Sequence, residues 1–470
     1  MSGLYASLNA SVGALSAQSR AVETAGKNLA NVNNPSYARQ RVILGSLGTI
    51  HTAQGPESMG ITALAVEQLR DALLDKQVSR EISQTAAYFA EQQAYHRAEA
   101  SLGQNIDGTQ NASGTSSTTA NGVAAALDDF FSAFQSLAAN PTDAGQRQTL
   151  LQTTSILTDR IRLADQRLAQ VGSDLDAQIA DDVSTTNRLL ASIAELNGQI
   201  ARLEINRPGS AADLRDQRQA NLELLAAKMP IDLRISASGQ TQLFSRDTTG
   251  ADVLLVDGLH VAGPINFTGA TLAGGAAAAT LALSSGALQG SLTARDSGVQ
   301  AIRSSLDQLS AQLVTAVNSA YNPTGLTGNF FQPTGTTAAT LAVASGVTAA
   351  TLKASDGGAA GDNSVALAIG QLANKKFSVA AGDVLTGTLG GYFSTAVSNL
   401  GQAIAGVTAR VTDQSNIEQL VRAQRDAVSG VSLDEETADL LKYQRAFQAS
   451  SRFFNTIDSL LDTVVNRLGV

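Results

Sequence analysis

The chain has 470 residues, more than one hydrophobic core usually serves, so about two to four domains are expected. Lys and Arg number 32 against 41 Asp and Glu, and the net charge of −9 with no basic run excludes nucleic acid and anionic membranes as expected partners. Without cysteine there are no disulfides or thiolate metal sites. No stretch reaches the ~18 consecutive apolar residues of a membrane span, and the first residues lack the pattern of a cleaved secretory signal.

The N-terminal segment is predicted to be a helix over residues 2–31 with an apolar residue at every seventh position. This series consists of Leu8, Leu15, Val22 and Leu29, and small residues flank it. A period of seven keeps one stripe facing the same direction and is typical of helices that pack along other helices. The helix is expected to end near Asn31, since Pro35 disfavours the α conformation in the residue before it. An extended stretch is expected over 37–44.

The interior is predicted to contain long helices. They are expected over 68–102, 124–139, 150–203 and 213–228, with a polar loop at 103–122. The third would span roughly 80 Å at 1.5 Å per residue, which is typical of a rod-like element. A β-containing unit is expected over 231–292, because Ile231, Leu233 and Ile235 alternate and residues 253–256 are apolar.

The C-terminal half is predicted to return to helix. One helix is expected around 299–317, short strands and loops over 321–370, and another helix over 393–428. A break at 429–432 follows, where Ser432 and Glu435 form a capping box that starts the last helix. That helix is expected to continue to Leu468 and to end at Gly469.

The last helix carries the longest seven-residue series, which consists of Leu433, Leu440, Phe447, Phe454, Leu461 and Leu468. A two-stranded coiled coil usually carries Glu and Lys beside its seam, whereas few charges flank this series. Such a wide apolar face favours a helix surrounded by several others, as in a tube or bundle. Two alternatives stay open: the terminal helices pack together inside a monomer, or the last helix belongs to a large monomeric bundle.

These patterns predict a mainly α fold with smaller β-containing inserts, in which a long helical bundle ends in a coiled-coil-like terminal domain built from the N- and C-terminal helices. Four regions are expected: a terminal helical domain (1–45 plus 425–470), an elongated helical bundle (46–230 plus 293–322 plus 390–424), a β-containing insert (231–292) and a Gly/Thr/Ala-rich insert of strands and loops (323–389). The residues expected to drive assembly lie on the two terminal helices: Leu4, Leu8, Leu15, Val22, Leu29, Leu433, Leu440, Phe447, Phe454, Ile457, Leu461, Val464 and Leu468.

Enzymatic signatures are weak in this chain. The three histidines, His51, His96 and His260, are far apart, and neither a His-Glu-x-x-His pair nor a Gly-x-Ser-x-Gly elbow occurs. The acidic pairs at 128–129 and 181–182 are expected to lie on solvated helix faces. We therefore predict no catalytic, cofactor-binding or metal-binding residue. A hydrolase within the β-containing insert is the enzymatic alternative.

Two terminal motifs resemble those of a known family. Residues 28–31 with 34–37 and Arg39 resemble the N-terminal signature of bacterial flagellar axial proteins, although Ser36 stands where that family usually has glycine. Residues 429–436, 443–449 and Arg452 are similar to the C-terminal signature of the hook-associated protein 1 family. The motif residues are Asn28, Asn31, Asn34, Pro35, Tyr37, Arg39, Ser429, Gly430, Asp434, Glu435, Tyr443, Gln444 and Arg452. Interior segments at 193–200, 214–218 and 328–331, with Asn318, are similar to the same family.

The resemblance implies a structural protein without cofactor that joins the flagellar hook to the filament. It implies export through the flagellar type III apparatus without a cleaved signal, and an extracellular place at the hook-filament junction. The implied partners are further copies in a ring, hook protein, hook-associated protein 3 and a cytoplasmic export chaperone. The alternatives are hook protein or another axial or coiled-coil surface protein, and a hydrolase domain carried on an axial scaffold. We also expect the N-terminal segment to be disordered in the monomer and to fold on docking.

Overall fold

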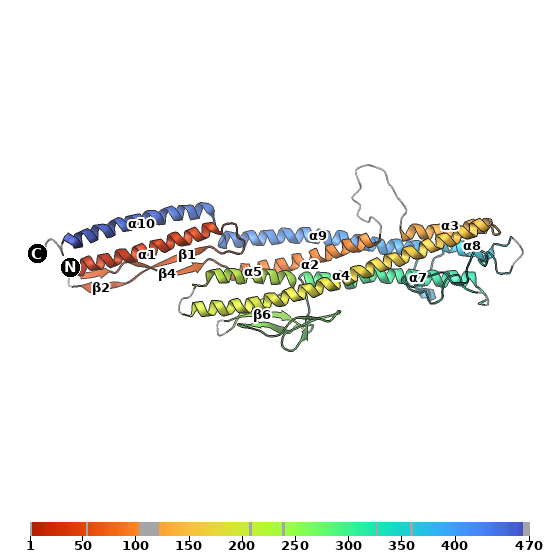
Figure 1. Cartoon of the computed structure of the whole chain (residues 1–470), viewed down its shortest axis with the longest axis horizontal. Coiled ribbons are helices and arrows are strands. Elements are labelled where there is room, and N and C mark those ends of the chain that lie inside the picture. The colour runs from red at the N-terminus through yellow and green to blue at the C-terminus, as the bar shows by residue number, and fades with distance from the viewer. Residues whose placement is uncertain are drawn as a thin grey trace. The chain divides into compact units, whose positions relative to one another are not determined.

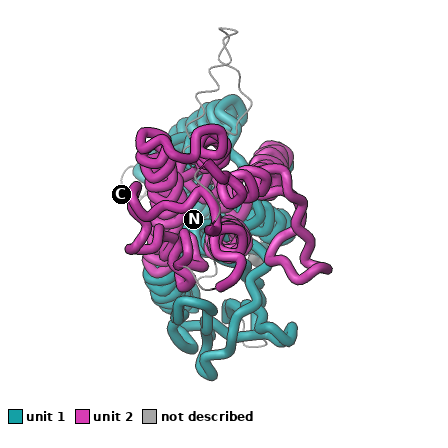
Figure 2. Tube along the Cα trace, turned by 90° about the vertical axis from the view of Figure 1, so that its right-hand side faces the viewer, with its two compact units in different colours: residues 1–85, 183–286, 414–470 teal, residues 86–182, 287–413 magenta. Residues whose placement is uncertain are grey.

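The computed structural model describes residues 2–52, 55–102, 122–205, 209–236, 240–325, 328–357 and 361–463. The chain forms two compact units, each assembled from segments that are far apart in sequence (Figure 2). Unit 1 consists of Met1–Thr85, Val183–Gly286 and Gln414–Val470, and unit 2 of Ala86–Asp182 and Ala287–Asp413. The division into four regions made from the sequence stays a prediction.

Helices dominate the fold, which confirms the predicted mainly α class (Figure 1). The α-helices are α1 (Ser2–Ala30), α2 (Ala72–Leu102), α3 (Val123–Ala139), α4 (Ala144–Glu204), α5 (Ala212–Lys228), α6 (Ala287–Thr293), α7 (Gln300–Tyr321), α8 (Ser364–Gln371), α9 (Leu389–Ser429) and α10 (Leu433–Asp462). A π-helix, η1 (Ala294–Val299), joins α6 to α7, and η2 (Leu372–Asn374) and η3 (Val379–Ala381) are 3₁₀ turns. None of the helices in the described ranges combines the length with the apolar composition that a bilayer span requires.

Several helix boundaries differ from prediction for local reasons. Helix α2 begins at Ala72 rather than at residue 68, because Asp71 caps it: its Oδ1 accepts hydrogen bonds from the backbone N–H groups of Leu73 and Leu74 at 2.8 and 3.2 Å. The predicted cap of α10 is confirmed, since Ser432 Oγ accepts from the backbone N–H of Glu435 at 3.5 Å. The predicted end of that helix at Leu468 and Gly469 lies outside the described residues.

Four strands follow α1, of which only the first stretch was predicted. Strand β1 (Gln40–Ser46) pairs antiparallel with β4 (Ile61–Gln68), and β2 (Thr49–Thr52) pairs with β3 (Gly55–Ser58). Helix α1 packs on β1 and β4. Gly60 permits this approach, because it has a φ of +90° and a Cβ there would lie 2.8 Å from the Cα of Ala10. Residues 46–52 and 55–68 are therefore strand and turn, although no strand was predicted beyond residue 44.

The predicted β-containing insert is present in unit 1. Strands β5 (Asp232–Ile235), β6 (Thr241–Arg246), β7 (Asp252–Asp257) and β8 (His260–Val261) form an antiparallel sheet in chain order, and β9 (Asn266–Phe267), β10 (Leu272–Gly274) and β11 (Ala279–Thr280) form a second sheet in the order β11-β10-β9. Asn187 of α4 binds the insert through both ends of its amide, since Nδ2 donates to Ile265 O at 2.8 Å and Oδ1 accepts from Ile265 N at 2.8 Å.

Unit 2 is built around a cluster of aromatic rings. Phe130 and Phe134 of α3 contact Phe330 with ring centroids 6.1 and 5.3 Å apart, and Tyr321 at the end of α7 lies 5.4 Å from the same ring. The loop that carries Phe330 is held by Asn318, whose side chain accepts from Phe331 N at 2.8 Å and donates to Phe331 O at 3.0 Å. This explains why the loop, predicted only as strands and turns, contributes to the core.

Candidate functional site

The terminal helices pack against each other in unit 1, as predicted for a terminal helical domain (Figure 1). Helix α1 also contacts β1 and β4, so its faces are shared between the hairpin and α10. The fully buried positions of α1 are small or polar rather than large and apolar: Ser11, Ala17, Ala21, Thr24, Ala25 and Asn28. Small side chains let backbones approach closely, which is how this helix packs without a large apolar core.

The seven-residue series does not mark the most deeply buried face of either helix. On α1, Leu4, Leu8, Leu15, Val22 and Leu29 are all half-buried. On α10, Ile457 and Leu461 are buried, Leu440 and Phe454 are half-buried, and Leu433 and Phe447 are exposed. Val464 and Leu468 lie outside the described residues. The assignment of the whole series to assembly stays a prediction.

Helix α10 has two apolar faces with different surroundings. Ile457 is 4% exposed and belongs to the face that packs in unit 1, whereas Leu441, Phe453 and Leu460 are 56, 55 and 50% exposed. A single apolar side chain on a surface is ordinary, but several along one helix mark a surface that binds another molecule. The face predicted to be too wide for one partner is thus only partly covered by α1.

A group of polar side chains, called the junction here, joins the end of α1 and the residues that follow it to the start of α10. At its centre is Asn28, which is 1% exposed. Its Nδ2 donates to Gln40 O and to Glu436 Oε2, both at 2.9 Å. Its Oδ1 accepts from the Tyr37 hydroxyl at 2.8 Å and from Gln40 N at 3.0 Å. All four hydrogen-bonding positions of the amide are therefore used, so aspartate or leucine of similar size would leave a buried partner unsatisfied.

The charges of the junction are also paired. Arg39 places Nη1 at 2.5 Å from Glu435 Oε2 and Nε at 2.6 Å from Glu436 Oε1, and its Nη2 lies 3.7 Å from Asp439 Oδ2. Burial alone would lower the pKa of Arg39, but the charge and hydrogen bonds of Glu436 and Glu435 outweigh it and raise that pKa. Since Glu436 is only 3% exposed, removing Arg39 would leave a buried carboxylate without its cation.

Main-chain contacts complete the attachment. The backbone N–H of Arg39 donates to Ser429 O at 2.9 Å, so the turn before α10 binds the strand after α1. The side chain of Arg425 donates to Pro35 O at 3.0 Å and to Glu223 Oε1 at 2.7 Å, which joins α9 and α5 to the same turn. The segment that follows α1 and the turn that precedes α10 are therefore held by one group of side chains.

A second charged group supports the loop between α1 and β1. Arg70 donates to Asp216 Oδ1 at 2.6 Å, to Asp75 Oδ2 at 3.2 Å and to Ser36 O at 2.8 Å. Burial raises the pKa of Asp216, and the hydrogen bond and charge of Arg70 oppose that rise. Burial, with the charge of Asp216 next in size, raises the pKa of the Tyr37 phenol well above its ordinary value.

The structure brings together only some of the motif residues. Asn28, Tyr37, Arg39, Ser429 and Glu435 meet in the junction. Of the others, Pro35 accepts a hydrogen bond from the distant Arg425 through its carbonyl, and Asn31 and Asn34 form turn contacts at the end of α1. Gly430 lies against the backbone of Asp426. The remaining motif residues contribute no contact to the junction: Tyr443 is half-buried, and Asp434, Gln444 and Arg452 are exposed.

Sequence reasoning missed the partners of these motif residues. Arg70, Glu223 and Arg425 were not singled out, Asp216 was quoted only within the family-like segment 214–218, and Glu436 only as a neighbour of Glu435. Charged residues are mostly exposed, so nothing in a single sequence marks these five as buried and paired.

The described residues hold no cluster of three or more His, Cys, Asp or Glu side chains that could bind a metal ion. His96 lies 3.3 Å from Glu99 on the same helix, and His260 is exposed on β8. Of the acidic pairs, Asp128, Asp129 and Asp181 are exposed as expected. Asp182 is 6% exposed, which corrects the expectation of a fully solvated pair.

Comparison with known proteins matches three parts of the chain to flagellar families. Residues 110–333 match the helical domain of flagellar hook-associated protein FlgK, residues 423–468 the C-terminal region of flagellar basal body rod FlgEFG proteins, and residues 8–37 the flagella basal body rod protein. The two terminal matches include most of the junction.

Full-length relatives are similar at low identity. Flagellar hook-associated protein 1 of Bacillus subtilis strain 168 is 26% identical over 527 residues, which cover 100% of this chain and 99% of that protein. The Escherichia coli K12 protein of the same name is 22% identical, covering 98 and 99%. The structure of the flagellar hook junction protein FlgK from Burkholderia pseudomallei is 22% identical with a TM-score of 0.44, covering 52% of this chain and 43% of that one. The chain is therefore similar over its full length to flagellar hook-associated protein 1, and over residues 110–333 to the helical domain of FlgK.

Proposed function

We propose that this chain is a structural component of the bacterial flagellum that joins the hook to the filament, and that it assembles through its terminal helices. The observation that carries this is the uncovered apolar face of α10, formed by Leu441, Phe453 and Leu460. Ile457 and Leu461 of the same helix are already buried within unit 1, whereas these three side chains stay exposed, so the helix has further apolar surface available for neighbouring subunits. Burying that surface would stabilise an assembly at about 25 cal/mol for each Å² of apolar area removed from water.

The polar junction has a different role in this proposal. Its hydrogen bonds join residues separated by about four hundred positions in the sequence, such as Asn28 and Glu436. Polar groups have strict distance and angle requirements, whereas apolar contacts do not. The junction therefore sets the position of α10 along α1, so that the uncovered face is presented in one orientation. The terminal segments 1–45 and 425–470 are accordingly proposed as the assembling domain.

The proposed partners are further copies of this chain in a ring, hook protein, hook-associated protein 3 and a cytoplasmic export chaperone. The proposed location is extracellular, at the hook-filament junction, after export through the flagellar type III apparatus without a cleaved signal. Nucleic acid, membrane and cofactors have no part in this function, and we propose that the chain is not an enzyme.

Deletion of the gene tests the proposal and separates it from its alternatives. We expect the deletion strain to carry hooks without filaments and to release flagellin into the medium, and expression of the chain to restore filaments. Loss of the hook itself would instead identify a hook protein. A strain with normal filaments would overturn the structural proposal and leave the hydrolase alternative, which turnover assays on the purified chain would then address.

A further inference from the structure

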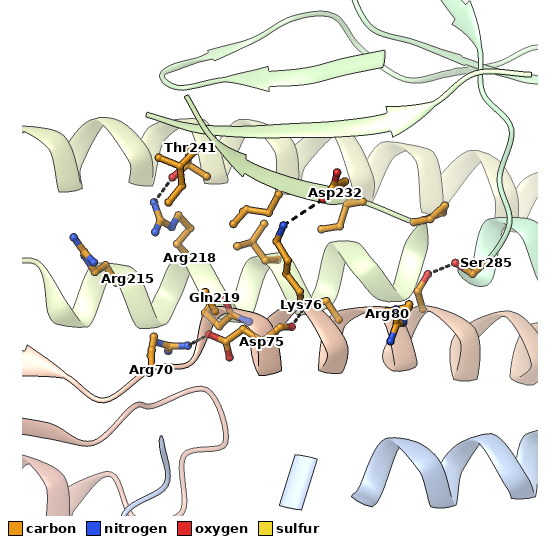
Figure 3. Close-up of a pocket in the computed structure, with 18 of the residues that line it drawn as sticks. Arg70, Asp75, Lys76, Arg80, Arg215, Arg218, Gln219, Asp232, Thr241 and Ser285 are labelled. Carbon is orange, nitrogen blue, oxygen red and sulfur yellow. Dashed lines mark hydrogen bonds and ion pairs between the residues drawn. The ribbon is translucent and has the colours of Figure 1, made fainter. Parts of the chain in front are cut away.

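Unit 1 contains a cavity that the terminal junction does not use. It has a volume of about 680 Å³ and lies among α2, α5 and the strands β5 and β6 (Figure 3). This volume falls within the roughly 300–1,000 Å³ that is typical of small-molecule sites. Helices α2 and α5 and strands β5 and β6 supply most of its walls, and residues 230–231 and 284–285 between elements complete them.

One part of the wall is apolar. Leu222 of α5 is buried and contributes its side chain together with Pro230, Ile231 and Leu233 at the start of β5. Leu222 lies one helical turn beyond Arg218 on α5, so an apolar and a cationic side chain share one face of this helix. The cavity thus has an apolar region next to a charged one, the arrangement that orients an amphipathic ligand.

The charged lining is strongly positive. Six cationic side chains and two carboxylates face the cavity: Arg70, Lys76, Arg80, Arg215, Arg218 and Arg246, with Asp75 and Asp232. Both carboxylates are already paired within the cavity wall, Asp75 with Arg70 at 3.2 Å and Asp232 with Lys76 at 3.5 Å (Figure 3). Arg80 and Arg215 pair with Glu81 and Glu204 outside the wall. Within the described residues this leaves Arg218 and Arg246 as the cations of the lining that have no carboxylate partner.

Arg218 is the group that lacks compensation most clearly. Its Nη1 donates to Asn197 Oδ1 at 2.9 Å and to Thr241 Oγ1 at 3.0 Å, both of which are neutral. Within the described residues, no carboxylate lies within ion-pair distance of Arg218, whereas Arg215 pairs with Glu204. Burial, followed by the charge of Arg215, lowers the pKa of Arg218 to about 10. Arg218 is half-buried, so its guanidinium has lost part of its hydration, and an anion from elsewhere that pairs with it would offset this cost.

We propose that this cavity binds an organic acid, with its carboxylate against Arg218 and its apolar stem against Leu222, Ile231 and Leu233. A guanidinium binds carboxylates in a planar, two-point geometry, and in the described part of the chain only Nη1 of the two terminal nitrogens of Arg218 forms hydrogen bonds. The same chemistry can come from a free small acid or from an acidic side chain of another copy. The proposal does not depend on the flagellar role.

Calorimetric titration of the full chain tests the site with octanoate, acetate and octanol as probes. We expect octanoate to bind saturably, and acetate and octanol to bind at least about tenfold more weakly, because each lacks one half of the recognised structure. Absence of saturable octanoate binding at millimolar concentration overturns the proposal. Equal binding of acetate overturns the role of the apolar wall.

Substitutions of Arg218 test whether its guanidinium is the group that binds the carboxylate. Arg218→Met keeps an apolar stem and removes the guanidinium, so octanoate binding should weaken by about tenfold or more. Arg218→Lys retains the charge and should bind more tightly than Arg218→Met, which keeps the test valid if the methionine variant folds poorly. Arg188→Met, at an exposed position on α4, is the matched control and should bind octanoate like the parent. Equal affinity of the parent and Arg218→Met contradicts the assignment.

A second arm distinguishes the two sources of the carboxylate. The mass of the full chain is measured by light scattering at high protein concentration, with and without saturating octanoate. A lower mass in octanoate assigns the natural carboxylate to a side chain of another copy, because the probe displaces it. An unchanged mass, together with saturable octanoate binding, assigns it to a free acid.

Discussion

Asn28 shows how much one buried side chain can determine. Its amide joins α1 to Gln40, Tyr37 and Glu436, using both donors and both acceptor positions. Removal of such a group leaves several buried partners without hydrogen bonds, and the loss is larger than that of the bonds alone. This position therefore links the conformation of the chain after α1 to the placement of α10.

Substitution of Asn28 by alanine should destabilise the terminal helix pair by about 3 kcal/mol, since a buried carboxylate and a buried hydroxyl lose a partner together. The measurement is hydrogen exchange of peptides from α1 and α10 in the full chain, which reports the free energy of local opening. Asn33→Ala, at an exposed turn position, is the control and should change little. Equal exchange in the two variants would show that the junction contributes nothing to helix pairing.

The buried phenol of Tyr37 is expected to make the free energy of unfolding fall at alkaline pH. Burial raises the pKa of its phenol, so the folded chain keeps this proton above about pH 10, where the unfolded chain releases it. Its contribution to stability is therefore complete below about pH 10 and is lost as the pH rises toward the folded pKa, with a slope of up to about 1.4 kcal/mol per pH unit.

Denaturant unfolding of unit 1 at about pH 8 and about pH 11 measures this loss. We expect Tyr37→Phe to be less stable than the parent at the lower pH, because it lacks the hydrogen bond to Asn28, yet to lose less stability between the two values. Tyr5→Phe, at an exposed position, is the control. An identical pH-dependent loss in the parent and Tyr37→Phe would contradict the assignment.

At the residue scale, sequence resemblance identified only part of the junction. Asn28, Tyr37 and Arg39 were grouped correctly, because they lie within one short motif. Other members, such as Glu436 beside Asn28, Arg425 beside Pro35 and Asp216 beside Ala38, are charged residues from distant segments, and their burial depends on tertiary packing that no local pattern records. The same holds for Arg218, which in the sequence is one of many helical arginines.

At the element scale, α10 separates two functions of one helix. Ile457 packs inside unit 1, whereas Phe453, one helical turn away, is more than half exposed. Substitution of Ile457 should therefore mainly lower the stability of the monomer, and substitution of Phe453 should mainly impair assembly. Ile457→Ser should destabilise the terminal pair by about 2–5 kcal/mol, the range for large-to-small changes in a core. Phe453→Ser should change monomer stability by about 0.5 kcal/mol or less.

In assembly, the order of the two variants should be reversed, and Phe453→Ser should show a defect that its stability does not explain. Phe453→Ser should fail to restore filaments to the deletion strain although the exported protein is folded, since it loses apolar area that only neighbouring subunits can cover. The paired measurements are unfolding of the purified chain and filament number in the complemented strain. Gln448→Ser, at an exposed polar position of α10, is the control. Full complementation by Phe453→Ser would remove this face from the proposed assembly surface.

Element prediction succeeded where periodicity extends over many turns and failed where pairing is non-local. The long helices were predicted because apolar spacing persists along them, as in α4 (Ala144–Glu204). The ladder of β1 and β4 was missed beyond residue 44, because its strands are short and partly exposed and alternate weakly. The π-helix η1 was also missed. Within it, Gly298 lies against the ring of Tyr95, where a Cβ would be 2.2 Å from Cε1, and this close approach is a tertiary contact that the local sequence does not record.

At the scale of the whole molecule, the core of unit 2 and the contact of the terminal helix pair in unit 1 differ in the size of the side chains they bury. Unit 2 encloses large aromatic side chains, among them Phe130, Phe330 and Phe331, which are fully buried. The terminal pair in unit 1 instead buries alanines and serine along α1. The four-region division already joined residues 1–45 with 425–470, because the seven-residue series at the two ends predicted helices that pack together. No local pattern places residues 183–286 in the same unit as these terminal segments, since that depends on long-range contacts.

This contrast predicts unequal local stability within the isolated chain. Burial of a large side chain contributes about 1.5–3 kcal/mol and burial of alanine much less, so α1 should open at a smaller free-energy cost than α3 or α7. Hydrogen exchange of the full chain should therefore show fast exchange for α1 and α10 and strong protection for α3 and α7. The sequence predicts that the N-terminal segment is disordered until it docks. The structure instead gives a helix, α1, which we expect to be weakly protected until it docks.

A substitution in the other unit provides the matched test. Phe330→Ala removes the central ring of the aromatic cluster and should lower protection of α3 and α7 by about 3–5 kcal/mol, while α1 keeps its exchange rates. Addition of assembled hooks or further axial subunits should then slow exchange of α1 and α10 and leave α3 unchanged, since assembly covers the apolar face that the monomer leaves open. Protection of α1 equal to that of α3 in the isolated chain would mean that the terminal helices need no neighbour to be stable, and that assembly contributes nothing to their folding.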